Sequence, residues 1–222
     1  MNNCCIIVAG GNGSRMGSNI PKQFLLLKGI PVLMHTIRNL FNFDRSLRLI
    51  LVLPADEVIG WYDLCRQYNF EIPHQIIEGG DTRFQSVKNG LGLTGGCELI
   101  GVHDGVRPLV SHATLWRCYN CAATEGTAIP VIPAGESLRC GNMGKSVPVD
   151  RTQFFMVQTP QVFKASIILD SYNQAWIPEF TDDASVVEHY GTSVNLVTGN
   201  RENIKITFPE DILIAELFLN TP

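Results

Sequence analysis

Residues 47–53 read LRLILVL, and this nearly continuous apolar run is the feature that most constrains the fold. Successive side chains of a β-strand point to opposite faces of the sheet, so an apolar run of this length must be covered on both faces. Buried strands of this kind are typical of parallel sheets that carry helices on both sides. The run therefore predicts a sheet covered by two layers of helices.

Strand and helix patterns alternate along the rest of the chain. Short apolar runs predict strands at residues 4–8, 74–77, 99–103 and 194–197. Helical spacing and end signals predict helices at residues 32–41, 57–68, 83–93, 113–124, 164–175, 183–190 and 209–219, the last one amphipathic. The alternation predicts an α/β fold with a Rossmann-like, mostly parallel sheet flanked by helices.

Three polar segments follow predicted strands directly. They are the glycine loop that begins at Ala9, the stretch GGDTR and the stretch HDGVRP. Ligands of open α/β sheets bind beyond the carboxyl ends of the strands. We therefore expect the three segments to meet at one rim of the sheet.

The pattern changes at residues 133–156, which have several glycines, no helical period and two short alternating stretches. These features predict a β-hairpin arm that protrudes from a single domain spanning residues 1–222. A hairpin alone is marginally stable, so we expect the arm to pack on something, with a second copy of the chain as the candidate.

Composition limits the partners. The 222 residues are 45% hydrophobic and 17% charged, with a net charge of −4, which is typical of a globular protein and argues against a nucleic-acid surface. We expect no membrane span, because no apolar stretch approaches the roughly 18 residues that one needs. The odd count of 7 scattered cysteines predicts reduced thiols and a cytoplasmic location. The lone pair Cys118 and Cys121 is interpreted as buried helix cysteines rather than as a metal site.

The glycine loop fits an open phosphate cradle better than two better-known motifs. A dinucleotide fingerprint would use Gly11 and Gly13, but Met16 stands where its third glycine belongs. A P-loop would end in Gly-Lys-Ser/Thr, and no such tripeptide follows. Glycines let backbone N–H groups face phosphate oxygens, while Arg15 offers a bidentate fork and Lys22 a point charge.

Ordered motifs carry a resemblance to one family. The opening AGGNGSRM followed by PKQF looks like the signature of sugar-nucleotide-type nucleotidyltransferases. GGDTRFQSV, HDGVRP, VDRTQFF, QTPQVF, TDDAS and NRENIKITFPED resemble, in that order, the 2-C-methyl-D-erythritol 4-phosphate cytidylyltransferases. The resemblance implies transfer of CMP from CTP to methylerythritol phosphate with release of pyrophosphate, on the non-mevalonate route to isoprenoids.

The resemblance also implies site residues. The CTP contacts would be Ala9, Gly10, Gly11, Gly13, Arg15, Lys22, Gly80, Asp81, Ser86 and Gly105. The polyol phosphate acceptor would be held by Asp104, Arg107, Arg151, Thr159, Thr181 and Lys205. The catalytic set would be Arg15, Lys22, Asp104 and Lys205, with Asp104 also binding Mg²⁺. In the family the arm reaches the partner's site, so Arg151 would act across a homodimer.

Transfer of CMP to a phosphate is also chemically reasonable for these residues when the family resemblance is set aside. A phosphomonoester has a second pKa of about 6, so the attacking oxygen is already ionised near neutral pH and needs no strong base. Catalysis would then consist of positioning and of charge neutralisation by fixed cations and Mg²⁺. His103, the last residue of an apolar strand, is interpreted as a hydrogen-bonded structural histidine rather than as a base.

Three alternatives remain open at this level. Ribitol 5-phosphate cytidylyltransferases share the glycine loop and QTPQ. The methylerythritol enzymes more usually carry two alanines where this chain has Gly105 and Val106, and this difference favours the ribitol enzymes slightly. TDDAS and GNRENIKITFPED favour the methylerythritol enzymes more firmly. A nucleotide-binding regulatory protein without turnover would bind CTP but release no pyrophosphate. A dehydrogenase would need the dinucleotide fingerprint that is broken here.

Overall fold

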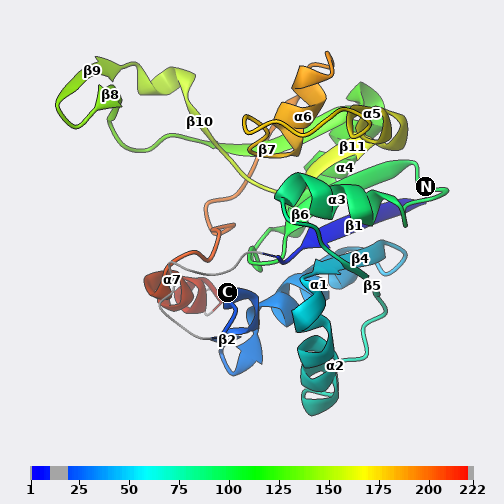
Figure 1. The fold of residues 1–222 in the computed structure, drawn as a ribbon. Coiled ribbons are helices and arrows are strands. Elements are labelled where there is room, and N and C mark those ends of the chain that lie inside the picture. The colour runs from blue at the N-terminus through cyan, green and yellow to red at the C-terminus, as the bar shows by residue number, and fades with distance from the viewer. Residues whose placement is uncertain (1, 11–19, 220–222) are drawn as a thin grey trace.

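The computed structural model describes residues 2–10 and 20–219, and an eight-stranded sheet lies at its centre (Figure 1). The order across the sheet is β10-β7-β11-β6-β1-β4-β5, with β12 beside β7. Its strands are β1 (Asn3–Val8), β4 (Arg48–Leu53), β5 (Gln75–Glu78), β6 (Leu99–Asp104), β7 (Thr127–Pro133), β10 (Phe155–Val157), β11 (Gln161–Lys164) and β12 (Leu196–Thr198).

Most neighbouring strands of the sheet are parallel. β1 pairs in parallel with β4 and β6, β4 with β5, and β12 with β7. β11 lies antiparallel between β6 and β7, and β10 pairs antiparallel with β7. The mostly parallel sheet predicted from the sequence is confirmed.

The described part of the chain has seven α-helices; six of them cover the two faces of the sheet, and α7 packs beside β2 in a smaller cluster. They are α1 (Val32–Phe43), α2 (Val58–Gln67), α3 (Arg83–Leu91), α4 (His112–Glu125), α5 (Ala165–Ser171), α6 (Asp183–His189) and α7 (Pro209–Leu219). Short 3₁₀ turns are η2 (Lys22–Phe24), η3 (Ala55–Glu57) and η4 (Arg151–Gln153). None of the helices described is both long and apolar enough to cross a membrane.

Alternate residues of the central strands enter two separate cores. On β1, Cys5 and Ile7 pack with residues of α1, α2 and α4, whereas Cys4 and Ile6 pack with residues of α3, α5 and α6. All four of these β1 side chains are fully buried. The apolar run of β4 is divided between the same two cores, so the cover on both faces that its sequence predicts is confirmed.

Three strands of the sheet have no counterpart among the predicted strands: β7, β10 and β11. β7 reads TAIPVIP, and its prolines weaken the strand signal because proline cannot donate a ladder hydrogen bond. β10 and β11 have only 3 and 4 residues, too short to show a period.

Two of the predicted helices past the arm differ from expectation in detail. α5 ends at Ser171, four residues earlier than the pattern predicts. α7 forms, but its predicted amphipathic character is wrong. Leu213 and Leu217 are 64% and 67% exposed, and the buried member of the helix is Ala215.

The predicted hairpin arm is confirmed. β8 (Leu138–Asn142) and β9 (Lys145–Val149) form an antiparallel two-stranded sheet of their own, apart from the central sheet. Figure 1 shows it projecting at the upper left, away from the helices. The other small sheet pairs β2 (Leu26–Leu27) with β3 (Ile30–Pro31). That the whole chain is one domain stays a prediction.

Gly105 marks a close approach at the end of β6. A Cβ added there would lie 2.9 Å from the Cβ of Ala9 and 3.1 Å from Cδ1 of Leu33. The Gly105 N–H donates to the carbonyl of Val8 at 2.8 Å, and its own carbonyl accepts from Thr36 Oγ1 at 2.8 Å. Glycine therefore lets the ends of β1 and β6 meet tightly beside the rim.

Candidate active site

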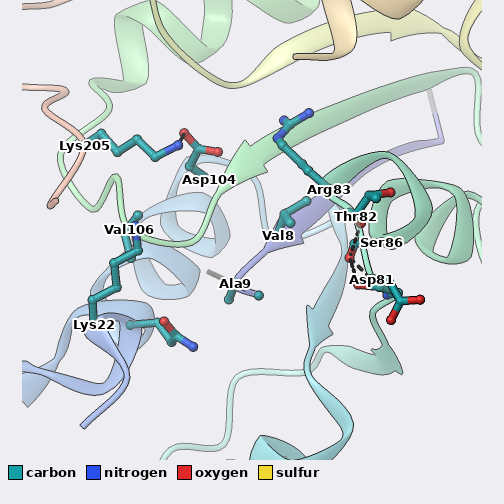
Figure 2. A pocket seen from close by; sticks show the side chains of 13 residues that line it. Val8, Ala9, Lys22, Asp81, Thr82, Arg83, Ser86, Asp104, Val106 and Lys205 are labelled. Atoms are coloured by element: carbon teal, nitrogen blue, oxygen red, sulfur yellow. Dashed lines mark hydrogen bonds and ion pairs between the residues drawn. The ribbon is translucent and has the colours of Figure 1, made fainter. Parts of the chain in front are cut away.

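A cavity of about 300 Å³ opens at the carboxyl ends of β1, β5 and β6 (Figure 2). We call it the first cavity. Its lining includes predicted site residues from all three polar segments, from η2 and from the loop after β12: Ala9, Gly10, Lys22, Gly80, Asp81, Ser86, Asp104 and Lys205. The expected convergence at one rim is confirmed for these residues. Gly11, Gly13 and Arg15 lie outside the described residues.

The start of α3 shapes one side of the first cavity. Thr82 caps the helix, since its hydroxyl accepts from the N–H of Gln85 at 3.0 Å. Ser86 Oγ accepts from the Gly80 N–H at 3.1 Å and donates to the carbonyl of Thr82 at 3.0 Å. A Cβ at Gly80 would overlap the Gln85 side chain, so glycine suits this turn best. The turn is thus held by its own polar groups before any ligand binds.

Lys22 reaches the cavity from the opposite side, on η2. Its neighbour Gln23 is fully buried, and Gln23 Nε2 donates to Glu57 Oε2 at 2.5 Å. Glu57 ends η3, which follows β4. This contact ties the lysine-bearing turn to the central sheet.

A second cavity, also of about 300 Å³, adjoins the first. It is lined by residues of the QTPQ and TDDAS stretches and by Arg107. Five predicted acceptor-binding residues line it: Asp104, Arg107, Thr159, Thr181 and Lys205. Both cavities are lined by Arg83, Asp104 and Lys205, and we call these three residues the shared wall.

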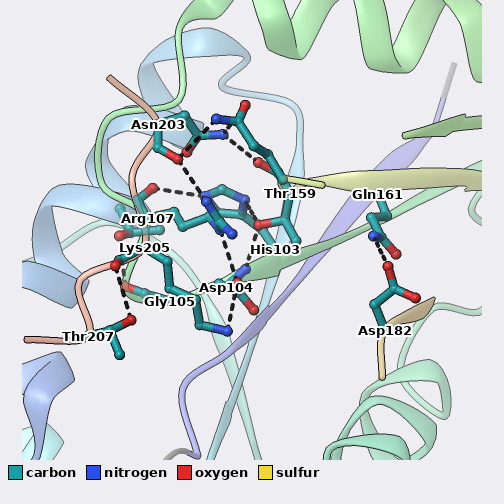
Figure 3. A network of polar contacts seen from close by, with 12 residues as sticks. His103, Asp104, Gly105, Arg107, Thr159, Gln161, Asp182, Asn203, Lys205 and Thr207 are labelled. Atoms are coloured by element: carbon teal, nitrogen blue, oxygen red, sulfur yellow. Dashed lines mark hydrogen bonds and ion pairs between the residues drawn. The ribbon is translucent and has the colours of Figure 1, made fainter. Parts of the chain in front are cut away.

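Asp104 is the charged centre of the shared wall. It is 7% exposed, and its Oδ2 accepts from Arg107 Nε at 3.0 Å and pairs with Lys205 Nζ at 3.2 Å (Figure 3). Burial alone would raise the pKa of Asp104. The charges of Lys205, Arg83 and Arg107 outweigh burial and hold this pKa well below its usual range. The carboxylate therefore stays ionised at any pH at which the protein works.

Behind Asp104 lies a closed chain of hydrogen bonds. The Asp104 N–H donates to Thr159 Oγ1 at 3.0 Å, and this hydroxyl lies 2.9 Å from His103 Nδ1. His103 Nε2 lies 3.0 Å from the carbonyl of Arg107, which can only accept. His103 is therefore protonated on Nε2, and Thr159 donates to Nδ1.

His103 is structural, as its sequence position suggests. It is fully buried, and burial lowers its pKa to about 4 despite the charge of Asp104. A neutral imidazole with both nitrogens engaged cannot serve as a base toward either cavity. The hydroxyl of Thr159 accepts from the Asp104 N–H and donates to His103. The predicted contact between Thr159 and the acceptor therefore stays a prediction.

The structure also locates three further predicted site residues, Arg107, Gly105 and Arg151. Arg107 donates from Nη1 to the carbonyl of Asn203 at 2.7 Å as well as to Asp104, which ties the rim of β6 to the Lys205 loop. Gly105 is not among the described residues that line the two cavities, and its contact with CTP stays a prediction. Arg151 lies in η4 at the base of the arm, exposed, and donates to the carbonyl of Gly135 at 2.8 Å.

Arg83 carries no predicted role, yet it belongs to the shared wall. Its guanidinium is bonded to both oxygens of Asp183, at 2.9 and 2.6 Å. The two residues are 100 positions apart, so no local sequence pattern connects them. The one available signal was the arginine inside GGDTR, directly after a predicted strand.

The described residues hold no group of three or more histidines, cysteines and carboxylates that could bind a metal by itself. Mg²⁺ does not need such a group, since it is commonly held by one or two carboxylates together with substrate phosphates. Asp104 is ionised and faces both cavities, so the residues present fit an ion of this kind.

Comparison with known proteins identifies one family. The family model described as 2-C-methyl-D-erythritol 4-phosphate cytidylyltransferase matches residues 3–221. A protein of that name from Phocaeicola vulgatus is 51% identical over 99% of this chain and 100% of its own. Another from Syntrophus aciditrophicus is 39% identical over 96% of this chain and 94% of its own.

Solved structures of similar proteins share the fold. The 2-C-methyl-D-erythritol 4-phosphate cytidylyltransferase of Thermus thermophilus has a TM-score of 0.77 and 29% identity, and the match covers 100% of both chains. The 4-diphosphocytidyl-2C-methyl-D-erythritol synthase of Anaerococcus prevotii has a TM-score of 0.82 and 25% identity over 98% of both chains.

Proposed function

The chain belongs to the 2-C-methyl-D-erythritol 4-phosphate cytidylyltransferase family, and we propose how its two cavities divide the reaction between them. The enzyme transfers CMP from CTP to 2-C-methyl-D-erythritol 4-phosphate and releases pyrophosphate, giving 4-diphosphocytidyl-2-C-methyl-D-erythritol. This reaction belongs to the non-mevalonate route to isoprenoid precursors. The observation that carries the proposed division is the shared wall of Arg83, Asp104 and Lys205.

CTP occupies the first cavity in this proposal. Gly80, Asp81 and Ser86 hold the cytosine side, and Lys22 contacts the phosphates, a role that the family resemblance also gives to Arg15. The methylerythritol phosphate occupies the second cavity, where Arg107, Thr181 and Lys205 are available to it. The bond between the two substrates then forms at the shared wall, because that is where the cavities meet.

The residues at the shared wall suit a direct displacement on the α-phosphorus. The acceptor phosphate is ionised without help, so the site needs no general base, and the neutral, enclosed His103 is consistent with that. Lys22 and Lys205 neutralise charge that spreads over the phosphoryl oxygens and the departing pyrophosphate. No covalent enzyme intermediate is required.

Asp104 is the proposed ligand of Mg²⁺. Its ion pairs with Arg107 and Lys205 both use Oδ2, and we expect Oδ1 to meet the ion. When bound, Mg²⁺ supplies further positive charge to the phosphates. Lys205 and Arg107 hold the carboxylate in place, so the ligand is oriented before the ion arrives.

A homodimer formed through the arm is also proposed. Large apolar side chains at the arm and its base are exposed, among them Met143, Val147, Phe155 and Met156. Exposed apolar surface of this kind is typical of a protein interface. Arg151 stands at the same place and is not among the described residues that line the cavities of its own chain, so the proposal assigns it to the partner's acceptor site.

The proposed location is the cytoplasm. All seven cysteines are free thiols, including the exposed Cys140 on the arm. Free exposed thiols persist in reducing compartments, where disulfides do not accumulate.

Pyrophosphate release tests the function. The purified chain is incubated with CTP and Mg²⁺, and with either methylerythritol phosphate or ribitol 5-phosphate at equal concentrations. We expect release with methylerythritol phosphate to exceed release with ribitol phosphate by about 10²-fold, because ribitol phosphate is one carbon longer and lacks the methyl branch, so its shape and hydroxyl positions differ from those of the substrate. Faster release with ribitol phosphate, or CTP binding without any release, would contradict the assignment.

A further inference from the structure

Arg83 is the member of the shared wall for which family resemblance implies no role. It is the first residue of α3, directly after the cap Thr82. Figure 2 shows its side chain rising from the start of α3, on the side of Asp104 that is opposite Lys205. A phosphoryl group placed between the two cavities would therefore have Arg83 and Lys205 on either side of it.

Asp183 holds this guanidinium in a fixed orientation. Asp183 is fully buried, and its Oδ1 also accepts from Tyr172 OH at 2.7 Å. Arg83 bonds to both Asp183 oxygens through Nη1 and Nη2, at 2.9 and 2.6 Å. A guanidinium has five N–H donors in a rigid fork, so two bonds to Asp183 leave three donors for other acceptors.

The side chain of Arg83 is held but still open to solvent. It is 28% exposed, whereas Asp183 is 0% exposed. Burial alone would lower the pKa of Arg83, but the charge and hydrogen bonds of Asp183 raise it above its ordinary value. Arg83 thus presents a permanent positive charge to both cavities.

The position of Arg83 is unfavourable for the helix itself. The first turn of a helix carries partial positive charge and is stabilised by acidic side chains, not by a cation. α3 has no acidic residue in its first turn. Helix stability therefore gives no reason for an arginine here, whereas two anionic substrates that meet beside it do.

We propose that Arg83 donates a hydrogen bond to a phosphoryl oxygen at the shared wall and is a catalytic residue of the transfer. The inference rests on the proposed function of the two cavities. The oxygen could belong to the α-phosphate of CTP or to the acceptor phosphate, and the kinetic constants separate these two sources.

The competing explanation is that Arg83 only neutralises the buried Asp183. Arg83→Met alone cannot decide between them, because it leaves a buried carboxylate unpaired and so destabilises the fold. The double variant Arg83→Met/Asp183→Asn removes both charges, and the asparagine oxygen can still accept from Tyr172. Removing both partners of a buried pair is often neutral for stability. Asp183→Asn alone is the matched control, since it keeps the arginine.

The experiment measures kcat and the KM of each substrate for wild type, Asp183→Asn and the double variant, with thermal melting of all three. We expect the double variant to melt close to wild type and to lose about 10²-fold in kcat/KM, the usual loss for one preorganised contact to the transition state. Asp183→Asn should lose about tenfold or less, since it retains the guanidinium. A fall in kcat alone would assign the contact to the transferred phosphorus, and a rise only in the acceptor KM would assign it to the acceptor phosphate.

A folded double variant within about threefold of wild type in every constant would overturn the proposal, since that loss is far below one transition-state contact. Equal losses in the double variant and in Asp183→Asn would overturn it too. Wild type is measured in the same series, so a wild type that releases no pyrophosphate with methylerythritol phosphate would contradict the proposed function and not the role of Arg83.

Discussion

The shared wall and the β8–β9 arm differ in how each holds its charged side chains. Asp104 of the shared wall is nearly buried and is tied to Arg107, to Lys205 and, through its N–H, to Thr159. Arg151 at the base of the arm is exposed and donates one hydrogen bond to the carbonyl of Gly135. The shared wall is organised by contacts within one chain, whereas the arm is proposed to pack on a second copy of the chain.

The two regions differ in what fixes the position of their charged side chains. The rim charges are positioned by a sheet with a core on each face, so they need no partner to reach their geometry. A two-stranded hairpin has no core of its own and is marginally stable in isolation. The proposed function therefore expects substitutions in the rim to act on the site of their own chain, and substitution of Arg151 to act on the site of the partner.

The strongest way to sharpen this comparison is to remove one lysine from the lining of the first cavity and one from the arm. Lys22→Ala should lower kcat by about 10²–10³-fold, because in the proposed arrangement it deletes a cation beside the transferred phosphorus. Steady-state pyrophosphate release provides the measurement. Lys145→Ala, in the exposed strand β9, is the matched control and should stay within about twofold, as surface substitutions usually do. A loss under about threefold for Lys22→Ala would remove that residue from the mechanism.

A second test asks whether His103, in the hydrogen-bond network behind Asp104, stays unprotonated in the folded chain. The pKa of His103 is about 4 in the folded chain against 6.5 for an ordinary histidine. Between these values the unfolded chain binds the extra proton, so the free energy of unfolding falls as the pH drops. We expect a loss of about 2 kcal/mol from this group between about pH 7 and pH 5. Urea denaturation at both pH values provides the measurement.

His103→Gln isolates this contribution, since glutamine does not titrate. The variant is less stable overall, but its stability should fall by about 2 kcal/mol less than that of wild type over the same pH range. Parallel losses in wild type and variant would show that His103 takes up a proton in the folded state. That result would contradict the description of the rim as an enclosed network that differs from the exposed arm.

The third test concerns the arm and has the smallest expected effect. Arg151→Ala should lower turnover by about tenfold, the worth of one charge-assisted hydrogen bond. After subunit exchange with Lys22→Ala, turnover should recover to about a quarter of wild type, since about half of the dimers then carry one intact site of two. Turnover at the average of the two separate variants, with exchange verified by mass, would contradict a site shared between subunits.

Much of the fold follows from the sequence because buried parallel strands have a strong local signal. β1, β4 and β6 are apolar on both faces, and their runs are visible without any knowledge of the partner strand. β7 and β11 are also buried, but prolines interrupt one and the other has four residues. Their strand character comes from ladder pairing with distant residues, which no local pattern records.

The site residues likewise include some that the sequence could predict and some that it could not. Lys22, Asp81 and Asp104 belong to polar segments that follow strands, so their convergence could be predicted from strand direction. Arg83 becomes distinctive only through Asp183, which belongs to a helix far along the chain. Thr159 becomes a partner of His103 only after β11 is placed beside β6. Side-chain pairs across the sheet are tertiary facts, and local periodicity does not contain them.

The tight contact between Gly105 and Ala9 bears on how this chain can be engineered. The Cβ of an alanine at position 105 would lie 2.9 Å from the Cβ of Ala9 and 3.1 Å from Cδ1 of Leu33. Gly105→Ala therefore requires Ala9 or Leu33 to shift. A redesign of this edge of the site has to treat positions 9, 33 and 105 together.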